Sequence, residues 1–116
     1  MPELVSNLYD LNMLYEQVSY DDSMLKRFID IFLSTVPDDM GNLADALIAN
    51  DLDRVRSAAH KMKSSYGLMG AEWAKDLCFE IETISKTGIE TEKLPIIFGE
   101  LSDKFTKMVA LLQYVI

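Results

Sequence analysis

Apolar residues recur every three or four positions along most of this chain, which is the spacing of one face of an α-helix. The clearest example is the C-terminal stretch from about Thr91, whose apolar positions are Leu94, Ile97, Leu101, Phe105, Met108, Leu112 and Val115. Strict apolar–polar alternation, the pattern that indicates a strand, is almost absent. A spacing that alternates between three and four suits helices packed in an antiparallel bundle. The pattern therefore predicts an all-α fold.

Turn and capping residues divide the N-terminal half into two helices. A short opening helix includes residues 11–18 and ends in the polar segment Ser19–Asp22. Asp21 or Asp22 is expected to cap the next helix, because a carboxylate accepts hydrogen bonds from the free N–H groups of a first turn. That helix carries apolar residues on both sides of Pro37. Since proline lacks a backbone N–H, we expect it to kink or break the helix.

Three more helices follow in the C-terminal half. Asn50 and Asp51 form a short turn, and Asp51 is a suitable cap for the helix that comes next. Gly70 is expected to end that helix. A further helix covers about 71–85, with Gly88 as its C-cap. The predicted architecture is an antiparallel four-helix bundle with an additional short N-terminal helix.

Composition indicates one folded domain over residues 1–116. Hydrophobic residues make up 49% of the sequence, and the length is sufficient for a single core without disulfides or metal. The formal net charge is −8. This charge argues against nucleic acid or an anionic membrane as a partner, because both attract positively charged surfaces.

Nothing in the sequence indicates export or membrane insertion. No apolar run approaches the roughly 20 residues needed to span a bilayer. The N-terminus, Met1–Leu4, lacks the basic and apolar regions of a signal peptide. The single cysteine, Cys78, cannot form an internal disulfide, which suits a reducing compartment. The predicted location is the cytoplasm.

The main chemical candidate is the only histidine, His60. A single imidazole cannot build a multi-ligand metal site. If the segment is helical, Arg56, Lys63, Ser64 and Gly67 fall within about 60° of His60. Apolar residues occupy the other side of the helix: Val55, Ala59, Met62, Tyr66 and Met69. The histidine is therefore expected to face water within a small basic patch.

The residues around His60 resemble a known signature. The run Ala59-His60-Lys61-Met62-Lys63-Ser64-Ser65, closed by Gly70-Ala71, is similar to that of the histidine-containing phosphotransfer (HPt) domain. In that family His-x-Leu-Lys-Gly-Ser is followed by a Gly-Ala step. The histidine, the lysine and the second serine match, and methionine replaces leucine with little change in volume. The predicted order of helices along the chain also agrees with the family.

The resemblance implies a carrier in two-component signal transduction. His60 would accept a phosphoryl group from an aspartate of a receiver domain and pass it to another receiver in a phosphorelay. Receiver domains of response regulators or hybrid sensor kinases would be the partners, and the receiver would supply Mg²⁺. The carrier would have no cofactor and no ATP site of its own, so it would not be an enzyme. A monomer is the default for this family.

The resemblance also implies roles for residues near the histidine. Lys63, one turn further along, would bind the phosphoryl oxygens, with Arg56 and Lys61 adding positive field at longer range. Glu82 stands on the next helix at the position from which a family residue, glutamine in some members, accepts a hydrogen bond from Nδ1. A carboxylate there would fix the tautomer of His60 and raise its basicity. Lys61 and Glu82 could equally be ordinary exposed charges.

Two small residues on the same face are candidates for partner docking. Ser64 replaces the family glycine that lets a partner approach the imidazole. Gly67 is expected to leave room for the partner on the His60 face. The departure at Ser64 keeps an alternative open, an adaptor that binds a receiver or kinase without efficient transfer. The sequence gives little support for an enzymatic function, because it has no glycine-rich phosphate loop and no second histidine.

Overall fold

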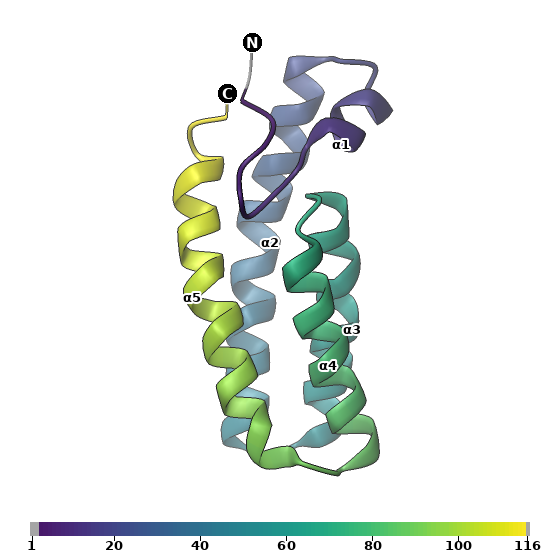
Figure 1. Ribbon diagram of the computed structural model, residues 1–116, viewed down its shortest axis with the longest axis vertical. Coiled ribbons are helices and arrows are strands. Elements are labelled where there is room, and N and C mark those ends of the chain that lie inside the picture. Colours follow the sequence, from purple (N-terminus) through teal and green to yellow (C-terminus); the bar gives the residue numbers. More distant parts are fainter. Residues whose placement is uncertain (1–2, 116) are drawn as a thin grey trace.

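Four long helices form an elongated antiparallel bundle, and a short fifth helix lies near one end (Figure 1). The computed structural model describes residues 3–115, so residues 1, 2 and 116 of the predicted domain lie outside the described residues. The bundle measures 45 × 22 × 21 Å. Its elements are α1 (Asn12–Gln17), α2 (Asp22–Ile48), α3 (Leu52–Leu68), α4 (Glu72–Thr87), the 3-10 turn η1 (Thr91–Lys93) and α5 (Leu94–Leu112). The predicted all-α bundle with a short N-terminal helix is confirmed.

The apolar stripes predicted from the sequence form the core. Every apolar position named above for the C-terminal stretch is buried, from Leu94 to Val115. Aromatic rings link three helices in the middle of the bundle, where the Tyr66 ring lies 5.7 Å from Phe32 and 6.1 Å from Phe105 between centroids. Burial of such stripes is the main contribution to the stability of a bundle.

Of the kink or break expected at Pro37, the break does not occur. α2 continues through this residue from Asp22 to Ile48. Phe32 and Val36 on one side of the proline, and Met40 on the other, all point into the same core. A proline in a helix costs about 3 kcal/mol, and the burial of apolar residues on both sides of it offsets that cost here.

The predicted helix ends are confirmed by their geometry. The Asp21 side chain accepts a hydrogen bond from the Met24 N–H at 3.1 Å, and Asp51 accepts one from the Arg54 N–H at 3.2 Å. Gly88 follows α4 with a left-handed φ of 69°.

The N-terminal segment closes the turn between α3 and α4. The Asp10 N–H donates to the Met69 carbonyl at 3.1 Å, and the Trp73 indole N–H donates to the Leu8 carbonyl at 2.8 Å. Gly70 lies in this turn with φ of 64°, and a Cβ there would lie 2.0 Å from the Asp10 carbonyl oxygen. Glycine is therefore required at position 70 both by backbone conformation and by space.

Candidate functional site

His60 lies on the outer side of α3 with 70% of its side chain exposed. The apolar residues predicted for the opposite side of this helix are all buried: Val55, Ala59, Met62, Tyr66 and Met69. The predicted assignment of faces is therefore confirmed. An imidazole in this position is accessible to a partner and contributes little to the core.

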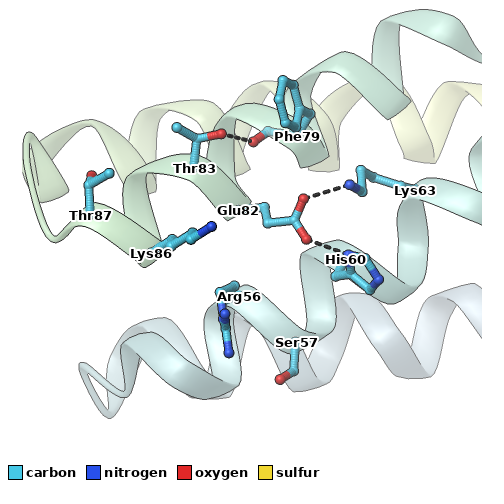
Figure 2. A pocket seen from close by; sticks show the side chains of 9 residues that line it. All are labelled: Arg56, Ser57, His60, Lys63, Phe79, Glu82, Thr83, Lys86 and Thr87. Atoms are coloured by element: carbon cyan, nitrogen blue, oxygen red, sulfur yellow. Dashed lines mark hydrogen bonds and ion pairs between the residues drawn. The ribbon is translucent and has the colours of Figure 1, made fainter.

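An open groove between α3 and α4 contains His60 (Figure 2). Its volume is about 800 Å³. α3 contributes Arg56, Ser57, His60 and Lys63, and α4 contributes Phe79, Glu82, Thr83, Lys86 and Thr87. The two helices are antiparallel neighbours joined by the tight turn at Gly70, which brings the middle of α3 opposite the middle of α4.

Glu82 connects two of the site residues predicted on α3, His60 and Lys63. One carboxylate oxygen, Oε2, is hydrogen-bonded to Nδ1 of His60, and the other, Oε1, lies 2.6 Å from Nζ of Lys63 (Figure 2). An ionised carboxylate only accepts hydrogen bonds, so Nδ1 carries the proton and donates it. The lone pair of the neutral ring is then on Nε2.

The neighbours of Glu82 keep it ionised. The hydrogen bond from Lys63 lowers the pKa of this carboxyl, partial burial opposes the shift, and the hydrogen bond from His60 lowers the pKa further. Only 16% of the Glu82 side chain and 24% of the Lys63 side chain are exposed. The Lys63 ammonium also lies 5.3 Å from the centroid of the Phe79 ring, within the range of a cation–π contact. Lys63 is therefore held by α4 rather than extended into water.

The two remaining cations predicted near His60 are placed differently. Arg56 lines the groove, as expected from its position one turn before His60. Lys61 does not line it, because its side chain leaves α3 towards α2, where Nζ lies 3.1 Å from Oδ1 of Asp39. Consecutive residues of a helix diverge by about 100°, so the residue next to His60 faces another helix. The structure does not bring Lys61 to the imidazole.

The two candidate docking residues lie beyond His60 towards the end of α3. Ser64 is exposed. Gly67 is half-buried, and a Cβ there would make an ordinary contact of 3.6 Å with Cδ of Lys75. The fold therefore does not itself require glycine at position 67.

Several groove residues on α4 were not predicted from the sequence. Phe79 is 58% exposed, and Lys86 points its ammonium towards Glu82 (Figure 2). Phe79 and Lys86 are three residues before and four after Glu82, so helical spacing places all three on one face. That spacing was the signal available in the sequence.

The thiol of Cys78 lies outside the groove. Cys78 is fully buried, and burial raises the pKa of its thiol to about 12.

Within residues 3–115, no three His, Cys, Asp or Glu side chains are grouped so that they could hold a metal ion. None of the helices described there is long and apolar enough to cross a membrane.

Comparison with known proteins identifies the family. The family model described as the Hpt domain matches residues 27–113, which is most of the chain. A search among curated proteins finds no significant match. The fold is similar to the crystal structure of histidine-containing phosphotransfer protein B from Pseudomonas aeruginosa PAO1, with a TM-score of 0.85, 22% identity and 94% of each chain covered.

A second solved structure has the same fold. It is the HPT domain of a sensor hybrid histidine kinase from Shewanella, with a TM-score of 0.76, 23% identity and 91% of each chain covered. Hpt domains are phosphocarriers rather than catalytic enzymes, and in general they interact with receiver domains of response regulators and hybrid kinases. The match of the family model over residues 27–113 shows that this chain belongs to the Hpt domain family, whose function is histidine phosphotransfer in phosphorelays.

Proposed function

We propose that His60 is the residue that carries the phosphoryl group, and that Nε2 is the atom that receives it. The observation that carries this assignment is the hydrogen bond between Nδ1 and Glu82 on a ring that is otherwise exposed. This bond directs the free lone pair of the imidazole away from α4. His60 is also the only histidine in the sequence.

The proposed reaction is exchange between this nitrogen and an aspartate of a receiver domain. The Nε2 lone pair attacks phosphorus of the aspartyl phosphate, the P–O bond to the aspartate breaks, and its electron pair stays on the aspartate carboxylate. The reverse step passes the group to a second receiver. Phosphoryl transfer depends mainly on positioning and charge stabilisation, and the receiver supplies Mg²⁺ and acidic residues for both.

Lys63 and Arg56 are the cations of α3 assigned to the phosphoryl group. The ammonium of Lys63 lies beside His60 because both bind the same carboxylate. A phosphoryl group on Nε2 would compete with Glu82 for this ammonium. Arg56 lines the same groove and adds positive field. Lys61 is not assigned to phosphate binding, because Asp39 holds its side chain towards α2.

The docking surface proposed for receiver domains begins beside the imidazole and continues towards the end of α3. It consists of Ser64, Gly67, Leu68 and Phe79, and two of these are exposed apolar side chains, Leu68 at 39% and Phe79 at 58%. Exposed apolar side chains with polar groups around them are the arrangement found at the core and rim of a protein interface. We further propose that the protein acts as a monomer in the cytoplasm and has no ATP site of its own.

The test of this function is phosphoryl uptake by the purified protein from two sources. One sample contains a phosphorylated receiver domain with Mg²⁺, and the other contains ATP and Mg²⁺ alone. We expect acid-labile, base-stable phosphate only in the first sample. Label from ATP alone would indicate an autokinase. Binding of several phosphorylated receivers without any label would indicate the adaptor, with Ser64 as the first residue to replace.

A further inference from the structure

Two cations face the groove without an anion of their own. Arg56 on α3 and Lys86 on α4 both line the groove, and neither side chain forms an ion pair within residues 3–115. We propose that Arg56 and Lys86 together bind a carboxylate of the receiver domain and thereby orient the receiver on His60. This inference rests on the proposed function. It adds a second contact area, on the side of His60 towards the start of α3.

The packing of α3 against α4 brings the two cations to the same level of the groove. The helices are antiparallel, so a step back along α3 is matched by a step forward along α4. The hydrogen bond between His60 and Glu82 fixes the register. Arg56 is four residues before His60, and Lys86 is four residues after Glu82. The two cations therefore stand on facing walls of the groove, about 6 Å along it from His60 (Figure 2).

The acid that lines the groove is already bonded on both oxygens. Lys86 points its ammonium towards Glu82, but Oε2 of Glu82 binds His60 and Oε1 binds Lys63. Like charges on facing walls repel each other, whereas a carboxylate between them is attracted by both. An anion from outside the chain is therefore the group that this end of the groove is suited to bind.

The position of the pair favours a partner protein as the source of this anion. Arg56 and Lys86 are both exposed at an open groove, so a receiver that reaches Nε2 of His60 also lies over them. The phosphoryl group itself would be on the other side of the ring, because the bond to Glu82 directs Nε2 away from α4. Carboxylates are the anions that the side chains of a protein surface supply.

The charge of the whole chain gives this pair a role in orientation. The formal net charge is −8. An acidic surface of a receiver is repelled by most of this protein and attracted at the groove, where Arg56, Lys63 and Lys86 lie. Complementary charges at the rim of an interface mainly raise the association rate and fix the register of the two proteins. Arg56 and Lys86 would thus be positioning residues for the receiver.

The first test measures binding of unphosphorylated receiver domains, so it does not require phosphoryl transfer. The probe is a receiver that binds the wild type. We expect its Kd for Lys86→Gln to be roughly threefold to fivefold higher, mainly through slower association. This difference should shrink between about 0.1 M and about 1 M salt, because salt screens exposed charges. Lys86→Arg should bind like the wild type. The control is Lys107→Gln, which removes the same charge from an exposed site on α5 outside the groove and should leave the Kd unchanged.

The second test identifies the bound group as a carboxylate. A water-soluble carbodiimide joins an amine to a carboxyl group in contact with it, forming an amide bond with loss of water. Mass spectrometry of the treated complex should find Lys86 linked to an Asp or Glu of the receiver. Lys86→Arg should bind the receiver without this cross-link, because guanidinium does not react. Changing that receiver carboxylate to its amide should weaken binding to the wild type and not weaken binding to Lys86→Gln any further.

Transfer kinetics separate this role from contact with the phosphoryl group. In single-turnover transfer, Lys86→Gln should raise the receiver concentration that gives half the maximal rate and leave the maximal rate unchanged. A lower maximal rate at an unchanged half-saturating concentration would assign Lys86 to the phosphoryl group and overturn the inference. Inorganic phosphate that binds the wild type but not Lys86→Gln would instead indicate a site for small anions, which would also overturn it.

Equal Kd values for the wild type and Lys86→Gln at low salt would overturn the inference, even if His60 carries phosphate. Cross-linking of Lys86 to no receiver carboxylate would do the same, and so would a failure of every receiver to bind. The proposed function fails in a different way, through absence of label from every phosphorylated receiver. Binding and cross-linking are measured without label, so the two failures are distinguishable.

Discussion

Lys61 of α3 is bonded to Asp39 of α2, with Nζ 3.1 Å from Oδ1, although Lys61 directly follows His60 in the sequence. Asp39 is buried, with 6% of its side chain exposed. Its other oxygen, Oδ2, has no hydrogen-bond partner among the described residues. Lys61 therefore compensates a buried charge between two helices of the bundle.

We predict that Lys61→Met destabilises the fold without preventing phosphoryl uptake. The substitution leaves a carboxylate buried and unpaired, and the expected loss is roughly 1 to 2 kcal/mol in the free energy of unfolding. Urea denaturation measures it. The double variant with Asp39→Leu should recover most of the lost stability. Lys26→Met, in the exposed pair with Asp30, is the control and should change stability by less than about 0.5 kcal/mol. Loss of phosphoryl uptake in a folded Lys61→Met protein would show that Lys61 takes part in phosphate binding.

We predict that Gly70→Ala is more destabilising than the same change at Gly88. Both glycines have a left-handed φ, 64° and 69°, but only at Gly70 does the new Cβ meet another group, the Asp10 carbonyl at 2.0 Å. We expect a loss of about 1 kcal/mol at Gly88 and about 2 to 3 kcal/mol at Gly70. Thermal and urea denaturation of both variants provide the comparison. Equal losses would mean that the N-terminal segment does not close the turn as described.

We predict that Ser64→Gly transfers phosphate as fast as the wild type, or faster. Ser64 is exposed on the face of α3 that we assign to receiver docking, and glycine would allow a partner to approach more closely. The cost in helix stability should be about 0.5 kcal/mol. Single-turnover transfer from a phosphorylated receiver measures the rate. Ser64→Ala is the control, because alanine keeps the Cβ and lacks only the hydroxyl. Slower transfer in both variants would show that the hydroxyl assists transfer.

We predict that the contribution of Glu82 to stability depends on pH. Its pKa in the folded protein is below its ordinary value, chiefly because of Lys63. The contribution is therefore complete above that ordinary value and is lost as the pH falls through the folded-state pKa. The free energy of unfolding of the wild type, minus that of Glu82→Gln, should decrease between about pH 5 and pH 3. A difference that stays constant over this range would contradict the ion pair.

The helical spacing of apolar residues was sufficient to predict the bundle. The stripe from Leu94 to Val115 is buried as expected, and Asp21 and Asp51 cap the helices that they precede. That α2 continues through Pro37 could not be predicted from local rules. Its cost is local, whereas the burial that offsets it comes from helices that are distant in the sequence.

In the candidate site, too, the placement of residues within one helix could be predicted, whereas contacts between helices could not. Geometry within one helix placed His60, Arg56 and Lys63 correctly, because their relative directions depend only on helical spacing. It could not show that Glu82 would bind both His60 and Lys63, or that Asp39 would bind Lys61. Those contacts depend on how α2 and α4 pack against α3. The position of Glu82 was available only through the resemblance to the family.

A comparison of the wild type with His60→Gln tests whether His60 is the phosphoryl acceptor. Both proteins are incubated with a phosphorylated receiver domain and Mg²⁺, and acid-labile, base-stable phosphate is measured. Circular dichroism checks the fold, which should persist because the side chain is 70% exposed. Label on the wild type and none on a folded His60→Gln protein is the predicted result. Equal label on both proteins would show that a residue other than His60 accepts the phosphoryl group.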